Sequence, residues 1–165
     1  MSQTISQLLL PEFDHEMANT RRTLERVPAH LADWKPHAKS MAMGALAYHL
    51  AGLSAWITRG LTRDEFDFTP GGDPGGMTTT AALLERFDTS VAEARRHLAD
   101  ATDEVMQQSW TFKRNGQTVF SQPKLMVVRT MALNHAIHHR AQLTVYLRLN
   151  DIPVPSLYGP SADER

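Results

Sequence analysis

The sequence contains no cysteine, and this absence excludes several functions at once. Disulfide bonds, thiolate metal sites and cysteine nucleophiles all need a thiol side chain, so none of them can occur here. Any bound metal ion must be held by histidine, aspartate or glutamate. Any thiol that takes part in a reaction must come from a small molecule.

Long apolar runs and a large excess of charge are also missing. The apolar run at residues 8–10 stops at Pro11, and no run reaches the length that spans a membrane. The N-terminus has no basic segment of the kind that begins a signal peptide. With 17 basic and 18 acidic residues the net charge is −1, so no large positive field gathers nucleic acid. We therefore expect a cytoplasmic protein without a membrane or nucleic-acid partner.

The composition that remains is that of a globular protein. Hydrophobic residues make up 42% and charged residues 21% of the 165 residues. A chain of this length buries about two-thirds of its unfolded surface, which is enough for a core without cross-links. We expect a single domain that covers residues 1–165.

Apolar residues recur at helical spacing in four segments, which favours an all-α, antiparallel four-helix bundle. Pro11 either lies in the first turn of the first helix or kinks it, and Ser40 is the expected N-cap of the second. Pro123 suits the first turn of the last helix, and Asn150 ends it. The expected helices span about residues 2–26, 41–60, 80–100 and 123–150.

Two connections carry information of their own. Residues 64–77 are rich in glycine and proline, which predicts a loop. Asn115 and Gly116 suit a tight turn with positive φ, so a small hairpin is expected between the third and fourth helices. In the alternative architecture, an α+β domain, this hairpin belongs to a larger sheet. No other segment alternates convincingly, which favours the all-α bundle.

Three histidines form the candidate metal site. His135 and His139 are four residues apart, so their imidazoles lie on one helix face about one turn apart, a spacing that suits metal binding. Both fall within an apolar stripe, and His49 interrupts the apolar stripe of the second helix. Bundle packing can bring the three together, and three histidines with an open fourth position are typical of a catalytic metal site. The alternative is a set of hydrogen-bonded core histidines without a metal.

The other five histidines have simpler interpretations. His138 lies at the flank of the metal face and is interpreted as a neighbour of the site or an interface residue, not a ligand. The remaining four are expected to be solvated: His15, His30, His37 and His97.

Glu16 is an unexpected charged residue, because it lies between Phe13 and Thr20 on the apolar face of the first helix. A buried carboxylate is costly unless it is paired or near a cation. Glu16 is therefore a candidate catalytic residue, as a general base or as a neighbour that orients a histidine. The alternative, which this reasoning favours, is an ion pair with an inward arginine such as Arg129 or Arg140.

The sequence resembles the DinB-like family of metal-dependent bundle proteins. The resemblance is carried by residues 34–40, 46–49 and Trp56, by residues 134–143 and 146–148, and by the tail at 155–164. It implies a four-helix bundle with one divalent metal ion, zinc or nickel, on one histidine of the second helix and two of the last. Those positions are His49, His135 and His139. Ala141 departs from the glycine that relatives often carry, and we expect no consequence for the metal.

The resemblance implies a class of activity but not a substrate. Similar proteins include transferases and isomerases that use bacillithiol, mycothiol or glutathione. We expect a metal-dependent enzyme that acts on a small molecule, of thiol transferase or hydrolase type, with a low-molecular-weight thiol as a candidate cosubstrate. The alternatives are a non-catalytic metal-binding or sensing protein and a purely structural bundle.

The last helix also predicts a homodimer, because it is apolar nearly all round and must be covered on both sides. A partner subunit related by a two-fold axis could cover the second side. The alternative cover comes from the hairpin and the tail of the same chain, residues 152–158. The residues of the second apolar side are Met126, Leu133, Ile137, Ala141 and Val145.

Overall fold

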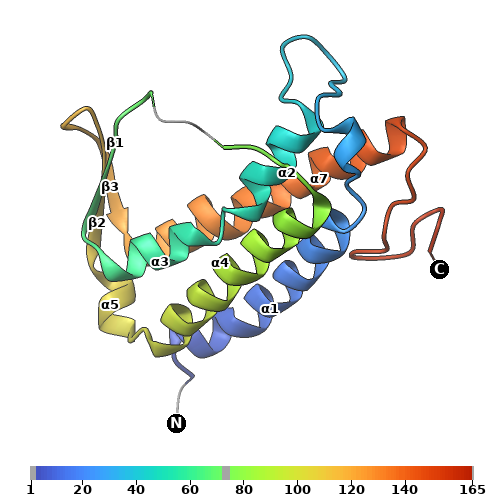
Figure 1. Cartoon of the computed structure of the whole chain (residues 1–165). Coiled ribbons are helices and arrows are strands. Elements are labelled where there is room, and N and C mark those ends of the chain that lie inside the picture. Colours follow the sequence, from blue (N-terminus) through green and yellow to red (C-terminus); the bar gives the residue numbers. More distant parts are fainter. Residues whose placement is uncertain (1–2, 72–74, 165) are drawn as a thin grey trace.

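The computed structural model describes residues 3–71 and 75–164, and it shows long helices packed side by side with a small sheet at one end (Figure 1). The fold is mostly helical, so the expected helical body is present, but the all-α description is incomplete. The helices are α1 (Ile5–Leu24), η1 (Ala29–Leu31), α2 (Met43–Ala51), α3 (Ala55–Thr62), α4 (Thr80–Asp100), α5 (Asp103–Gln107), α6 (Lys124–Met126), the π-helical segment η2 (Val127–Leu133) and α7 (Asn134–Leu149).

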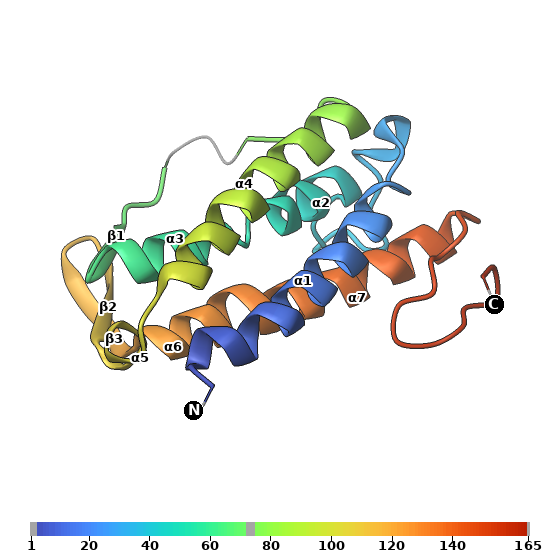
Figure 2. The same ribbon diagram turned by 90° about the horizontal axis from the view of Figure 1, so that it is seen from below.

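The helix directions differ from the predicted antiparallel arrangement. α1 packs against both α4 and α7, and α2 also packs against α4 and α7. α1 and α7 run side by side in the same direction (Figure 2). Arg129 of η2, which leads into α7, pairs with Glu12, and Arg140 of α7 pairs with Glu16 further along α1. α3 and α4 also run side by side in the same direction (Figure 1).

Helix α1 begins with a capping box, in which the Thr4 hydroxyl accepts from the Gln7 amide and the Gln7 side chain accepts from the Thr4 amide. Pro11 lies inside the helix, so the alternative that placed it in the first turn is wrong. The apolar face, which includes Phe13 and Leu24, is fully buried in the core.

The expected second helix is divided in two. α2 ends at Ala51, with Gly52 as its C-cap, and α3 begins after Ser54. The N-cap of α2 is Ala42, which makes no side-chain capping hydrogen bond, so Ser40 is not its N-cap. Glycine costs about 1 kcal/mol in a helix interior, and here it also allows a close approach. A Cβ atom at Gly52 would lie 2.6 Å from Nη2 of Arg86, so a larger residue would displace that guanidinium.

The sheet has three strands, in the order β1 (Glu65–Phe68), β2 (Ser109–Arg114) and β3 (Gln117–Pro123). β2 and β3 form the predicted hairpin, with Asn115 and Gly116 at positive φ. β1 pairs with β2 in parallel, from Glu65 opposite Thr111 to Phe68 opposite Arg114. The prediction that residues 64–77 form only a loop is therefore wrong at β1, and the hairpin belongs to a larger sheet, as in the alternative architecture.

The last helix runs through α6, η2 and α7 and ends at Asn150 as predicted. Its π-helical segment shifts the register of the faces relative to an ideal α-helix. His135 and His139 consequently lie at the edge of the buried stripe of α7, half-buried, and not at its centre. The stripe itself consists of Ala136, Arg140, Leu143 and Leu147.

The tail after α7 folds back over the bundle (Figure 1). Ile152 and Val154 pack against the core, and Glu164 forms ion pairs with Arg22 of α1 and with Arg26, which follows this helix. Leu133, one of the residues expected at a dimer interface, is fully buried within the chain, so part of the predicted second apolar side is covered without a partner. None of the helices in the described ranges combines the length and the apolar character needed to cross a membrane.

Candidate metal centre

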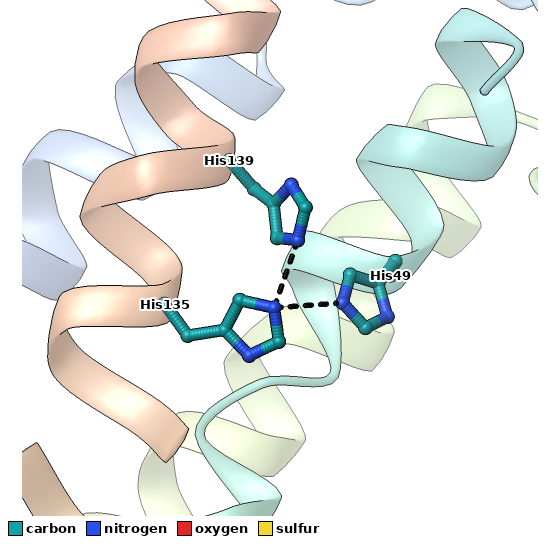
Figure 3. Close-up of side chains that lie close together, drawn as sticks. All are labelled: His49, His135 and His139. Atoms are coloured by element: carbon teal, nitrogen blue, oxygen red, sulfur yellow. Dashed lines mark hydrogen bonds between the residues drawn. The ribbon is translucent and has the colours of Figure 1, made fainter. Parts of the chain in front are cut away.

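The three predicted histidines converge where α2 packs against α7 (Figure 3). The Nε2 atoms of His49 and His135 lie 3.5 Å apart, and those of His135 and His139 lie 2.8 Å apart. One ligand nitrogen from each residue lies within 4.8 Å of the others, so the three could hold a metal ion. A tetrahedral ion with metal–nitrogen bonds of about 2.0–2.1 Å separates its ligand nitrogens by about 3.4 Å, which fits this cluster. The prediction that the three imidazoles converge is confirmed.

Burial keeps the three imidazoles neutral. Desolvation, followed by the charges of His139 and His135, lowers the pKa of His49 to about 4. Desolvation also lowers the pKa of His135 and of His139. At neutral pH each ring therefore offers a lone pair, which is the form that binds a metal ion.

Hydrogen bonds at the outer nitrogens orient the two rings of α7. His139 Nδ1 donates to Oε1 of Gln142 at 2.7 Å, and His135 is hydrogen-bonded to the backbone of Met131. With the proton on the outer nitrogen, Nε2 of each ring points toward the centre as an acceptor (Figure 3). Gln142 lies three residues after His139 on the same helix, and this spacing is its only signal in the sequence.

The cluster contains no carboxylate among the residues that the structure describes. Glu16 is buried, as predicted, but the partners of its carboxylate are Arg140 and Tyr158 and not the three histidines. Arg140 Nη2 donates to Oε2 of Glu16 at 2.6 Å, and the hydroxyl of Tyr158 lies 2.8 Å from both carboxylate oxygens. The ion pair with Arg140 is therefore the arrangement found, while Arg129 pairs with Glu12. The role of Glu16 as a general base stays a prediction.

The remaining histidines lie outside the cluster. His138 is exposed, with its ring centroid 4.9 Å from that of His139, which agrees with its interpretation as a neighbour of the site. The others are exposed or half-exposed at the surface: His15, His30, His37 and His97.

A cavity of about 450 Å³ adjoins His49, and no pattern in the sequence predicts it. Trp56 and Arg59 of α3 line one side, and Phe66 and Phe68 of β1 line another. Arg86 of α4 contributes a second cationic side chain. The histidine cluster therefore lies next to a space that could hold a small molecule.

The fold and the cluster together define a class of helical proteins with a three-histidine site able to hold a metal ion. Residues 1–165 match the DinB family, and the chain belongs to this family. It is 24% identical over 166 residues to the uncharacterized protein YrdA of Bacillus subtilis (strain 168), with 99% of this chain and 93% of that protein covered.

Two solved structures share the fold. A DinB-like protein from Bacillus cereus ATCC 10987 has a TM-score of 0.72 at 21% identity, covering 96% of this chain and 100% of that one. The DinB-like protein YjoA from Bacillus subtilis has a TM-score of 0.68 at 17% identity, covering 96% of this chain and 99% of that one. At these identities the likeness concerns the fold alone.

Proposed function

We propose that the chain binds one divalent metal ion, zinc or nickel, through His49, His135 and His139, and that it is a metal-dependent enzyme acting on a small molecule. The observation that carries this proposal is the meeting of ligand nitrogens from two helices within 4.8 Å. The Nε2 atoms of His135 and His139 lie 2.8 Å apart, and the partners of their outer nitrogens, Met131 and Gln142, favour the tautomers with a lone pair on both Nε2 atoms. Two lone pairs in such contact repel unless a cation lies between them.

The donor set supports catalysis more than a structural role for the ion. Three neutral imidazoles fill three positions of a tetrahedral shell and leave one open. A divalent ion bound there would lower the pKa of a bound water molecule or of a small-molecule thiol. The cavity that His49 lines could admit a substrate beside this position, which supports an enzyme of hydrolase or thiol transferase type.

The first test is elemental analysis of protein purified without an affinity tag, followed by calorimetric titration of metal-free protein with Zn²⁺ and with Ni²⁺. We expect one ion per chain. The variants H49A, H135A and H139A should each lose tight binding, whereas H138A is the matched control because His138 is exposed on the same helix. Tight binding by all three variants would contradict the metal site.

The second test addresses catalysis. Metal-loaded protein would be screened for thiol transfer with bacillithiol, mycothiol and glutathione, and for hydrolysis of small esters and amides. Turnover that is lost in H135A and kept in H138A would support the enzyme. A fully loaded protein without turnover in any of these assays would instead support the alternative, a non-catalytic metal-binding or sensing protein.

A further inference from the structure

The cavity beside His49 has an unusual combination of charge and apolar surface. Its volume of about 450 Å³ lies within the range of small-molecule sites, about 300–1,000 Å³. Trp56, Phe66 and Phe68 form apolar walls, and the ring centroids of Trp56 and Phe66 lie 5.2 Å apart. Arg59 and Arg86 are the only ionisable residues among its lining apart from His49 and Tyr48, within the part of the chain that the structure describes.

Neither arginine has a carboxylate within ion-pair distance among the described residues. Glu85 and Glu93 line an adjoining hollow together with both arginines, but they do not line the cavity that contains His49. Among the described residues that line the cavity beside His49, no carboxylate offsets the charge of the two guanidinium groups.

Stacking holds both guanidinium groups in place. The Arg86 guanidinium carbon lies 4.1 Å from the ring centroid of Tyr48, and that of Arg59 lies 5.1 Å from the centroid of Trp56. Such contacts orient the planar fork before a ligand arrives, so less side-chain entropy is lost on binding. Gly52 has no side chain, which leaves room for the Arg86 guanidinium in this position.

The environment of Arg59 also disfavours its charge in the absence of a ligand. Burial, together with the nearby charges of Arg63 and Arg86, lowers the pKa of Arg59, and the opposing effect of Glu93 is weaker. A bound anion would relieve this repulsion. A divalent ion on the three histidines would add further positive charge beside the same cavity.

We propose that this cavity binds a small organic anion with an apolar body. Its negative group pairs with Arg59 and Arg86, since guanidinium forks match carboxylate oxygens in a bidentate geometry. Its apolar body packs on Trp56, Phe66 and Phe68, which directs the rest of the molecule toward His49. As the substrate class of the metal site, this inference rests on the proposed function, but the anion site itself depends only on the two arginines and the aromatic wall.

The experiment compares 4-phenylbutyrate with the neutral 4-phenylbutanamide by isothermal titration calorimetry, with tryptophan fluorescence as a second readout of the wall at Trp56. We expect the acid to bind at least about tenfold more tightly than the amide, and added salt to reduce this preference. R59Q/R86Q should abolish the preference, and R86Q alone, at an exposed position, should reduce it several-fold. R96Q is the matched control, because Arg96 is exposed on α4 outside the cavity.

Titrating both metal-free and zinc-loaded protein separates the two proposals. Zinc binding without any preference for the acid overturns the anion site and leaves the metal site standing. A preference for the acid that depends on the arginines, in a protein that binds neither zinc nor nickel, supports the anion site and overturns the proposed function. Equal affinities for acid and amide, or a preference that persists unchanged in folded R59Q/R86Q, would overturn the inference.

Discussion

Replacing Arg140 by methionine should strongly destabilise the fold, because it leaves a buried carboxylate without its counter-charge. The side chain of Arg140 is 1% exposed and that of Glu16 is 7% exposed. Arg140 also donates to the backbone carbonyl of Glu16 at 2.9 Å and to the Thr20 hydroxyl at 3.2 Å, so R140M removes several partners at once. Removing one member of a buried ion pair typically costs about 3–5 kcal/mol of the free energy of unfolding.

Urea denaturation followed by circular dichroism measures this loss. For a chain of this size a slope of about 2–3 kcal/mol/M is expected, so the midpoint should fall by roughly 1–2.5 M. The matched control is R148M, because Arg148 pairs with Asp163 at the surface, where its side chain is 47% exposed. Exposed pairs contribute at most about 1 kcal/mol, so this variant should shift the midpoint by no more than about 0.5 M.

A double variant tests whether the cause is the unpaired charge. In E16L/R140M both charges are absent, and the stability should recover well above that of R140M, since replacing a buried pair by apolar residues is often close to neutral. A loss below about 1 kcal/mol in R140M would refute the reasoning, as would a double variant as unstable as R140M. If Glu16 has only this structural role, E16Q should alter the stability and leave the zinc affinity unchanged. If Glu16 is a general base, fully folded E16Q should instead lose turnover.

Three further predictions concern the site and the assembly. H135A should lose metal binding, and with it the roughly 2.7 kcal/mol of stability that an ion at one hundred times its Kd provides. Equal metal content and melting temperature in H135A and the wild type would contradict this, and H97A is the control. As the pH falls in metal-free protein, His49 takes up its proton at a higher pH in the unfolded chain than in the folded one, because its folded-state pKa is lowered to about 4. Stability should therefore fall as pH drops from about 6.5 toward 4, and this slope should flatten in H49Q; an unchanged slope would contradict the assignment. Light scattering of the wild type at micromolar concentration should give the mass of two 18.5 kDa chains. V145E should give a smaller mass, because Val145 is 56% exposed on α7. A single-chain mass for the wild type across a dilution series would exclude the homodimer.

Features with a local cause could be predicted from the sequence. The periodic apolar residues of α1 and α4 and the turn at Asn115 and Gly116 depend on neighbours a few residues away. β1 depends instead on β2, which lies far along the chain, and its alternation of Phe66 and Phe68 is too short to stand out within a segment rich in glycine and proline. The parallel course of α1 and α7 likewise depends on contacts between segments far apart in the chain, which no local pattern encodes.

The same distinction between local and distant causes applies to the residues of the candidate site. His135 and His139 could be recognised because four residues separate them on one helix, and His49 because it interrupts an apolar stripe. Glu16 was recognisable as an anomaly, but the choice between Arg129 and Arg140 depended on how far α1 and the last helix are displaced along each other. Tyr158 could not be connected to Glu16 at all, because the tail has no periodicity that reveals what it covers.

The parts of the chain that departed most from local expectation lie around the cavity beside His49. The interruption between α2 and α3 includes Gly52, which leaves room for Arg86, and the unexpected strand β1 carries the Phe66 that packs against Trp56. A continuous second helix and a plain loop would satisfy the sequence pattern better, yet neither would provide these walls. Departures from local preference are expected where a structure is shaped for function, since there the local cost is offset by another benefit. Because these departures lie next to the three histidines, they support, independently of the histidines themselves, the proposal that the functional site lies at this end of α2.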